Sequence, residues 1–510
     1  MKRAWLAFIT IPFLLFYALP VGAVEKEERK WQDETIYFLM VDRFNNGDNS
    51  NDLNIDTKDP KTYHGGDFEG VIKQLDYIKD MGFTAIWLSP VFDNAENGYH
   101  GYWVNDFYKT DEHFGSMETF KQLVKEAHKR DIKVILDFVV NHVGPEHPWL
   151  NDSSKADWFH PKQAEDGDDQ QEREDSWLQG LPVLNQDNPE VRKYLIDAAQ
   201  WWITETDIDG YHLDDVQNVP VDFWSEFAQK IKDAKSDFYL LGEVGSKDPR
   251  EIVQYDKAGF DGLLDYPLNE DLRTAFAKPD QPLEALLAAA EGNGEVYEAP
   301  FLMANFMDNH NTVRFTRDAV QNNQHPGARW RLALTYLYTV PGIPVVYYGS
   351  EIALDGGAGP DNRRQMNFMT DKELIDYITQ LGELRNEHPS LTRGSFDLLH
   401  EKDGMAVYKR TYKDEVSIIA INNTSKSQDV TLTEEELEKD KEMRGMLSGD
   451  LVRSTDGKYK LVLDREEAEI YSLADRTGLN IPYLTVMGAV YAAFFLFIFL
   501  VWRRAKRKRS

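Results

Sequence analysis

The chain has 510 residues, of which 42% are hydrophobic and 12% aromatic, enough to form a large buried core, and this composition excludes global disorder. It contains no cysteine, so disulfides, thiol nucleophiles and cysteine-ligated metals are excluded. The formal net charge of −30 at pH 7 argues against nucleic acids and other anionic partners and is compatible with a neutral substrate.

Both ends of the chain carry apolar segments. A basic start, an apolar run and a small-residue cleavage site predict a secretory signal peptide over residues 1–23. Residues 483–502 hold no charged side chain and precede a basic tail at 503–510, a pattern typical of a transmembrane helix with a cytoplasmic carboxyl terminus. We therefore expect a monomer in the cell membrane, spanning it once, with the body of the protein outside the cell.

Strand and helix patterns alternate through residues 31–143 and 186–390. The expected strands are 34–41, 85–88, 134–142, 210–215, 238–244, 261–264, 301–306 and 343–348. The expected helices are 68–81, 117–130, 189–204, 221–234, 282–290, 326–339 and 371–387. Eight such units predict an α/β fold, a (β/α)₈ TIM barrel.

Two further regions depart from this alternation. Residues 144–185 are polar, acidic and rich in proline, which predicts a small inserted domain after the third strand. After Pro389 the pattern changes to short alternating strands such as 405–409 and 416–422. We therefore expect an all-β sandwich domain over residues 391–475.

A loop near the amino terminus is dense in oxygen ligands. Residues 45–52, in one-letter code NNGDNSND, follow the first expected strand. Calcium takes six to eight oxygens from side chains and carbonyls of this kind. Composition alone leaves two interpretations open, a calcium loop and a solvated polar turn.

Two carboxylates stand at the ends of successive expected strands. Asp214 closes the strand at 210–215, and Glu243 lies at the end of the strand at 238–244. In a TIM barrel the carboxyl ends of the strands surround the active site. Retaining cleavage of a glycoside needs a nucleophile and an acid/base about 5 Å apart. Two acids at adjacent strand ends therefore indicate a glycosidase.

Aromatic and neutral polar residues accompany these acids. They occur in the segments Tyr99–Trp103, Asn141–His142 and Asp308–Asn311. Aromatic faces stack on sugar rings, and neutral donors bind sugar hydroxyls. The segments therefore favour a carbohydrate substrate.

Together these residues resemble the α-amylase family of glycoside hydrolases, family thirteen. The family's motifs occur in order at Asp137–His142, Gly210–Asn218, Glu243 and Phe306–Asn311, and the resemblance covers nearly all of residues 31–475. The tryptophan pair Trp201-Trp202 and the expected membrane tail look like a membrane-anchored, bacillus-type subgroup of this family.

The resemblance implies a role for each matching residue. It makes Asp214 the nucleophile and Glu243 the acid/base, cutting α-1,4-glucosidic bonds in starch or maltooligosaccharides. It implies substrate-binding roles for His100, Tyr102, His142, His212 and His310. It implies a calcium ion held by Asn46, Asp48, Asn51, Asp52, Gly65 and Asp67, and it makes Asn141 a ligand of the family's other calcium ion.

Some positions depart from the family pattern. Asn311 stands where the family has its third catalytic carboxylate, and His212 stands where it has an arginine that keeps the nucleophile ionised. The expected Lys-His is Gln217-Asn218, and an expected aspartate is Val183. One lost electrostatic contact of this kind typically costs about 10²–10³ in rate.

These departures leave two questions open. His212 either carries a proton and replaces part of the arginine's charge, or it is a neutral core histidine. The protein is either an extracellular α-amylase-type hydrolase with reduced activity, or a catalytically impaired surface protein that binds α-glucans on the same barrel.

Overall fold

The computed structural model describes residues 28–161, 180–476 and 481–507. The signal peptide predicted at 1–23 lies outside these residues. The chain divides into two compact units, Met1–Trp31 and Gln32–Ser510, and the elements that position the site belong to the second.

The described residues contain a sheet of eight strands in the order β8-β7-β6-β5-β2-β1-β10-β9, with every neighbouring pair parallel. A parallel bridge between Leu264 and Ala304 joins its two edges. The strands are β1 (Ile36–Leu39), β2 (Ala85–Leu88), β5 (Lys133–Phe138), β6 (Gly210–Leu213), β7 (Tyr239–Gly242), β8 (Gly262–Leu263), β9 (Ala304–Phe306) and β10 (Ile343–Tyr347). The predicted (β/α)₈ barrel is confirmed.

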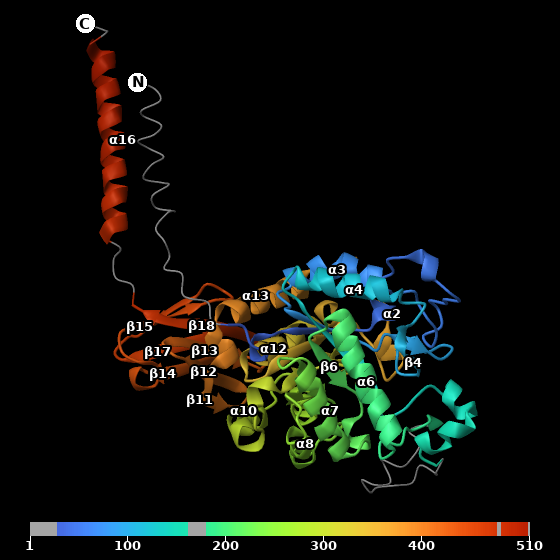
Figure 1. The fold of residues 1–510 in the computed structure, drawn as a ribbon. Coiled ribbons are helices and arrows are strands. Elements are labelled where there is room, and N and C mark those ends of the chain that lie inside the picture. Colours follow the sequence, from blue (N-terminus) through green and yellow to red (C-terminus); the bar gives the residue numbers. More distant parts are fainter. Residues whose placement is uncertain (1–27, 162–179, 477–480, 508–510) are drawn as a thin grey trace. The chain divides into compact units, whose positions relative to one another are not determined.

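Helices surround this sheet, and α6 and α7 flank β6 in Figure 1. The helices up to the carboxyl-terminal domain are α2 (Val41–Phe44), α3 (Phe68–Asp80), α4 (Met117–His128), α6 (Pro189–Thr206), α7 (Val221–Ala234), α8 (Pro249–Asp256), α9 (Tyr266–Phe276), α10 (Glu284–Val296), α11 (Phe315–Gln321), α12 (Pro326–Thr339), α13 (Glu373–Glu387) and α14 (Pro389–Arg393). The helices α2, α8, α9, α11 and α14 were not predicted.

Local sequence signals set the entry into β6. The side chain of Asn188 caps the first turn of α6 by accepting from the backbone N–H of Glu190, and Pro189 occupies the first turn. The helix ends at Asp207, which has a left-handed backbone with φ of 57°. All four residues of β6 are buried, as expected of a parallel strand covered on both faces.

A hairpin that was not predicted carries the aromatic loop of the site. It pairs β3 (Phe92–Asn94) with β4 (Val104–Thr110), and its register shifts twice. The side chain of Asn94 accepts from the backbone N–H of Trp103 at 2.8 Å. Because the strands are short and irregular, their alternation is too weak to read from sequence.

Between β5 and α6 the described residues form two short 3-10 helices, Pro148–Asn151 and Ser153–Trp158, and two isolated bridges, His142 to Val183 and Phe159 to Leu184. Residues 162–179 lie outside the described part. The division of 144–185 into a separate inserted domain stays a prediction.

The carboxyl-terminal domain is a β-structure, as predicted. One sheet has the order β11-β12-β13-β18-β15-β16, and a second pairs β14 with β17. The elements are β11 (Ser395–Lys402), β12 (Met405–Tyr412), β13 (Glu415–Asn422), β14 (Gln428–Thr433), α15 (Glu434–Leu437), β15 (Lys441–Gly445), β16 (Leu451–Arg453), β17 (Lys458–Leu463) and β18 (Glu467–Asp475). Residues of both sheets, among them Val407 and Leu461, share one apolar core.

The last element corrects the membrane prediction. Residues Ile481–Arg507 form one helix, α16, which continues through Arg503 and Arg504 instead of ending before a basic tail. A spanning helix must stay apolar for about 20 residues. Across the parts of the chain that the structure describes, no helix is both long and apolar enough to cross a membrane. The predicted transmembrane helix at 483–502, and with it the separate tail at 503–510, is therefore wrong.

Candidate active site

The two acids chosen from the sequence meet at the carboxyl ends of β6 and β7. One oxygen of Asp214, one of Glu243 and a ring nitrogen of His310 lie within 4.8 Å of one another. Asp214 is 6% exposed and Glu243 is 3% exposed. Carboxylates of retaining glycosidases stand about 5–5.5 Å apart, whereas those of inverting enzymes stand roughly 6.5–9.5 Å apart. The spacing here fits the retaining arrangement.

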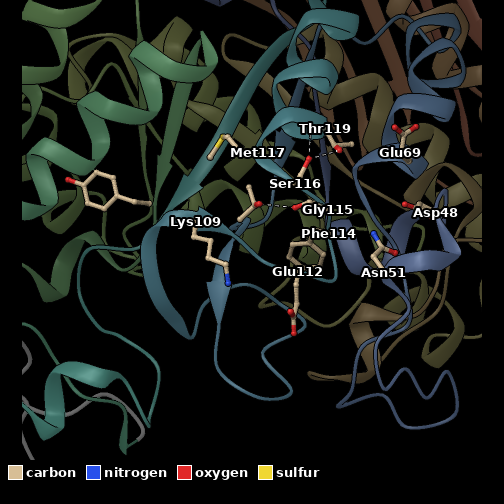
Figure 2. A pocket seen from close by; sticks show the side chains of 12 residues that line it. Asp48, Asn51, Glu69, Lys109, Glu112, Phe114, Gly115, Ser116, Met117 and Thr119 are labelled. Carbon is tan, nitrogen blue, oxygen red and sulfur yellow. Dashed lines mark hydrogen bonds between the residues drawn. The ribbon is translucent and has the colours of Figure 1, made fainter.

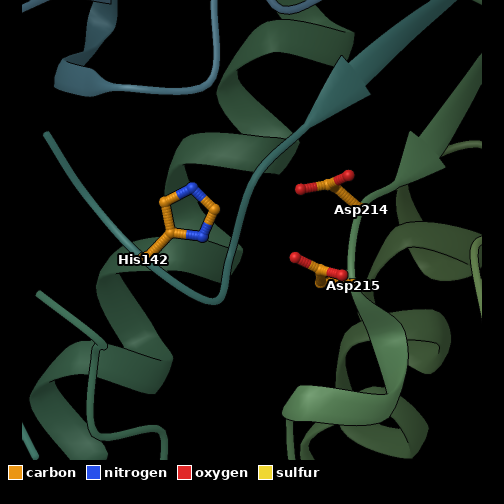
Figure 3. A group of neighbouring side chains, drawn as sticks. All are labelled: His142, Asp214 and Asp215. Atoms are coloured by element: carbon orange, nitrogen blue, oxygen red, sulfur yellow. The ribbon is translucent and has the colours of Figure 1, made fainter. Parts of the chain in front are cut away.

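A third carboxylate, Asp215, joins this group, and sequence reasoning missed it. One of its oxygens lies within 4.8 Å of an oxygen of Asp214 and a ring nitrogen of His142 (Figure 3). Burial raises the pKa of Asp215 to about 7. Burial also raises the pKa of Asp214 well above its usual range, helped by the charges of Asp215, Glu243 and Asp137. Burial thus favours the protonated forms of Asp214 and Asp215.

Donors surround one oxygen of Glu243. The hydroxyl of Tyr266 and the Nδ2 of Asn311 both donate to Glu243 Oε1, the latter at 3.2 Å. Asn309 donates in turn to the Tyr266 oxygen at 2.9 Å. Tyr266 begins α9 just after β8, so the strand-end rule could have found it had that helix been recognised. Asn311 therefore acts as a hydrogen-bond donor to the acid/base candidate.

His212 is fully buried between two acids. Its Nδ1 lies 3.0 Å from Asp137 Oδ1, and its Nε2 lies 3.7 Å from Glu243 Oε2. The ring packs against that of Trp87, with centroids 4.0 Å apart. The pairing of β5 with β6 puts Asp137 directly opposite His212. His212 therefore contacts the acids of the site from within the barrel.

Tyr102 is held in place from several sides. Its hydroxyl donates to Asp137 Oδ2 at 2.8 Å, and its ring stacks on His310 with centroids 5.0 Å apart. Its backbone N–H donates to His100 Nδ1 at 3.1 Å, and its carbonyl accepts from His142 Nε2 at 3.1 Å. The structure thus brings together the residues expected to bind substrate.

The histidines of this group favour the neutral form. Burial lowers the pKa of His142 to about 4. Burial also lowers the pKa of His100 and His310 well below their usual range, and the charge of Arg363 adds to the effect. Neutral imidazoles offer one donor and one acceptor each, which suits sugar hydroxyls.

The loop predicted to bind calcium fits an ion in part. The Oδ1 atoms of Asn46 and Asn51 are buried without a hydrogen-bond partner, and Asn46 Nδ2 donates to Asp52 Oδ1 at 2.8 Å. Gly65 has φ of +89°, and a Cβ there would lie 2.6 Å from Asp52 Oδ1. The same Cβ would lie 2.8 Å from Asn46 Nδ2, so the space beside Gly65 is bounded by one carboxylate oxygen and one amide nitrogen.

Asp67 and Asn141 have other partners. Asp67 caps α3 and accepts from the backbone N–H groups of Gly47, Asp48 and Gly70, so its oxygens are already engaged. Asp48 Oδ1 accepts from the N–H of Ser50 at 2.9 Å. Asn141 donates from Nδ2 to the carbonyl of Asn218 at 2.7 Å, while its Oδ1 lies 3.3 Å from His142 Nδ1.

Two hollows border these regions. The larger, of about 620 Å³, lies beside the oxygen-rich loop and includes Asp48, Asn51 and Glu69 in its lining (Figure 2). The smaller, of about 450 Å³, is lined in part by Gln217 and Gly245, which follow Asp214 and Glu243 in the chain. The smaller hollow is thus lined by segments that follow the two acids, without Asp214 or Glu243 themselves, while the larger lies beside the loop.

Comparisons with known proteins identify the family of this chain. Residues 38–450 match the alpha-amylase family model, described as the alpha amylase catalytic domain. The crystal structure of an Anoxybacillus alpha-amylase, presented as a new glycosyl hydrolase subclass, is 62% identical with a TM-score of 0.87, covering 89% of this chain and 100% of that one.

Curated relatives extend the comparison. The cyclomaltodextrinase of Thermoanaerobacter pseudethanolicus is 33% identical over 440 residues, covering 80% of this chain and 73% of that protein. The Beta/alpha-amylase of Paenibacillus polymyxa is 35% identical over 463 residues, covering 87% of this chain but only 38% of that protein.

A third relative is the intracellular maltogenic amylase of Bacillus subtilis, which is 32% identical over 439 residues, covering 81% of this chain and 72% of that protein. No helix of the described residues is long and apolar enough to span a membrane. The predicted single-pass location in the cell membrane is therefore wrong.

Proposed function

Because the chain belongs to the alpha-amylase family of glycoside hydrolases, we propose that it hydrolyses α-1,4-glucosidic bonds of starch or maltooligosaccharides with retention of configuration. The observation that carries the proposal is the approach of Asp214 and Glu243 to within 4.8 Å of each other at adjacent strand ends. A nucleophile and an acid/base need this spacing for a double displacement.

In the first step an Asp214 oxygen attacks the anomeric carbon. Glu243 donates its proton to the leaving glycosidic oxygen, the C–O bond breaks, and a glycosyl ester of Asp214 forms. In the second step the carboxylate of Glu243 takes a proton from water, and the oxygen of that water attacks the same carbon. The ester breaks and Asp214 is released as a carboxylate.

The surrounding residues position the sugar for these steps. The Tyr102 ring is fixed by Asp137 and the flanking histidines, and we propose that it stacks on the sugar before the cleaved bond. We propose that His100, His142 and His310 bind sugar hydroxyls from the same side. Their neutral forms avoid the cost of burying further charge.

Relatives of two kinds define the range of substrates. The Anoxybacillus protein is an alpha-amylase, and the Thermoanaerobacter relative is a cyclomaltodextrinase. We therefore propose α-1,4-linked glucose chains, linear or cyclic, as the substrate class.

A second candidate is an α-glucan-binding protein with little turnover. Asn311 favours it, because its amide donates a hydrogen bond to Glu243 where a carboxylate would stabilise a developing positive charge on the sugar. Under this candidate the pocket keeps its affinity for the sugar and loses most of its rate.

The release of reducing ends distinguishes the two candidates. The purified wild type is compared with Asp214→Ala and with the double variant His212→Arg, Asn311→Asp, on soluble starch and on a cyclodextrin. Turnover by the wild type well above Asp214→Ala supports the hydrolase. A wild type equal to Asp214→Ala beside an active double variant rejects it, and maltooligosaccharide binding by calorimetry then supports the binder.

We also propose that the loop holding Asn46, Asn51 and Asp52 binds calcium. Its support is the pair of buried amide oxygens without partners. In this proposal Asp67 shapes the loop through its backbone contacts, and Asp48 adds charge. Calcium should raise the melting temperature of the wild type and should not change the melting temperature of Asp52→Asn. A melting curve that ignores both calcium and a chelator contradicts the proposal.

A further inference from the structure

His212 lies between two buried acids that the proposed reaction uses or contacts. We propose that His212 is a positioning residue that carries a proton on both ring nitrogens and thereby holds Asp137 and Glu243 in their working positions. The inference rests on the proposed hydrolase function for its role, although the protonation itself can be observed without turnover.

The geometry places one acid at each end of the ring. Asp137 Oδ1 lies 3.0 Å from Nδ1, and Glu243 Oε2 lies 3.7 Å from Nε2. Neither oxygen has a hydrogen-bond partner within the described residues, nor does either ring nitrogen at good geometry. Four buried polar atoms are thus left in two facing pairs, and a proton on each nitrogen would give every one of them an opposite charge to face.

The alternative protonation states are less favourable. A neutral ring that keeps its proton on Nδ1 turns the Nε2 lone pair toward a carboxylate oxygen of Glu243, and the two repel. A neutral ring with its proton on Nε2 turns a lone pair toward Asp137 instead. With both acids ionised, only a ring that carries a proton on each nitrogen avoids repulsion at both ends. A neutral ring would need a proton on the facing oxygen of Glu243 or Asp137, and nitrogen NMR distinguishes the two arrangements.

Every element packed around His212 agrees with a positive ring. Trp87 on β2 offers its aromatic face at 4.0 Å between centroids, which favours a cation. Asp137 on β5 and Glu243 after β7 supply negative charge. Asp215, after β6, and His310, after β9, are also within electrostatic reach of His212.

The other contacts of the two acids give the bridge its consequence. Asp137 Oδ2 accepts from the hydroxyl of Tyr102, and Glu243 Oε1 accepts from Tyr266 and Asn311. Each acid therefore has one oxygen facing the sugar-binding side chains and the other facing His212. Loss of the His212 proton would release both acids together, so activity should fall at alkaline pH.

The test combines nitrogen NMR with pH profiles of the full-length protein. The chain has twelve histidines, so the His212 signals are assigned as those that vanish in His212→Gln. The matched control is His128→Gln, which removes a histidine–aspartate pair between α4 and the segment before β6, away from the site. The variant His212→Arg carries a charge that does not titrate in this range.

We expect His212 to show two protonated nitrogens at pH 5.5. We expect His212→Gln to lower kcat/KM by roughly 10–100-fold there, and His128→Gln to leave it unchanged. In the wild type, the alkaline fall of kcat/KM should follow the NMR titration of His212. In His212→Arg, the fall should move up by at least about one pH unit, because the guanidinium stays charged.

A neutral His212 at pH 5.5 overturns the inference, whatever the activity. The inference is also overturned if kcat/KM falls at the same alkaline pH in the wild type and in His212→Arg. If His212→Gln does not fold, the NMR measurement at pH 5.5 and the pH profile of His212→Arg still test the inference. Two protonated nitrogens without turnover in the wild type or His212→Arg, Asn311→Asp would support the bridge and reject the proposed function.

Discussion

Two histidine–aspartate pairs of the barrel, His128 with Asp209 and His212 with Asp137, differ in burial and in hydrogen bonding. In the first pair, His128 lies at the end of α4 and Asp209 directly precedes β6. His128 Nε2 makes a 2.8 Å hydrogen bond to Asp209, and the side chains of His128 and Asp209 are 32% and 17% exposed, respectively. At the active site, His212 and Asp137 are 3.0 Å apart, fully buried, and leave polar atoms without hydrogen bonds.

The difference separates stability from function. Asp209 also accepts from the N–H of Val134 and pairs with Lys235, so the first pair is satisfied and contributes modestly to stability. The second pair holds buried charges with incomplete partners, which costs stability. Such a cost is typical of sites that are kept for chemistry.

The largest effect should come from the nucleophile. Asp214→Asn should lower kcat/KM by at least about 10³-fold, because the amide cannot form the glycosyl ester. Its melting temperature at pH 8 should equal or exceed that of the wild type, since burial raises the pKa of Asp214 and ionising it is costly. Activity within tenfold of the wild type would remove Asp214 from the mechanism.

The second-largest effect should be an increase in kcat/KM in the variant Asn311→Asp. Asn311→Asp restores a carboxylate beside the sugar, and we expect kcat/KM to rise by about 10²-fold, consistent with one electrostatic contact. The matched control, Asn323→Asp, changes an exposed asparagine on the surface and should have no effect. An unchanged or lower rate in Asn311→Asp would show that the amide suits this site.

A third prediction concerns stability at the active site. Asp215 has a pKa of about 7 in the folded protein, so the folded state binds more protons than the unfolded chain between about pH 4 and pH 7. The stability linked to this group is present below about pH 4 and is lost as pH rises through 7. Asp215→Asn keeps the left-handed backbone and should be more stable than the wild type at pH 8, by about 2–4 kcal/mol.

Chemical denaturation at pH 4.5 and pH 8 measures this effect. The difference between Asp215→Asn and the wild type should be small at pH 4.5 and large at pH 8. Equal differences at the two pH values would mean that the carboxyl of Asp215 is not the titrating group.

The smallest effect, a change in stability, should come from replacing His128, whose hydrogen bond to Asp209 is satisfied. Its hydrogen bond to Asp209 raises the pKa of His128, so the stability that it contributes is present below about pH 6.5 and is lost as pH rises through the folded pKa. His128→Gln should therefore cost up to about 1 kcal/mol at pH 5.5 and less at pH 8. A loss that grows with pH would contradict this assignment.

Sequence reasoning recovered the barrel because its strands are apolar runs of the right length and its helices repeat apolar residues with the helical period. The helices α7 and α12 begin and end at the expected residues. The acids were found because strand ends converge in a barrel, a rule that needs no knowledge of side-chain contacts.

The remaining parts depend on contacts between distant segments. The hydroxyl of Tyr266 reaches Glu243 because α9 starts just after β8, the strand that pairs with β7. His212 faces Asp137 because of the register between β5 and β6. Neither relation has a local pattern. The membrane prediction treated the basic residues after Trp502 as a separate tail, whereas Arg503 and Arg504 belong to α16.

The stereochemistry of the first product tests the central claim most directly. Proton NMR can follow the anomer released from a maltooligosaccharide before mutarotation. Two successive displacements at the same carbon, by Asp214 and then by water, predict that the α-anomer appears first. If the β-anomer appears first, a single displacement has occurred and the pairing of Asp214 with Glu243 as nucleophile and acid/base is contradicted.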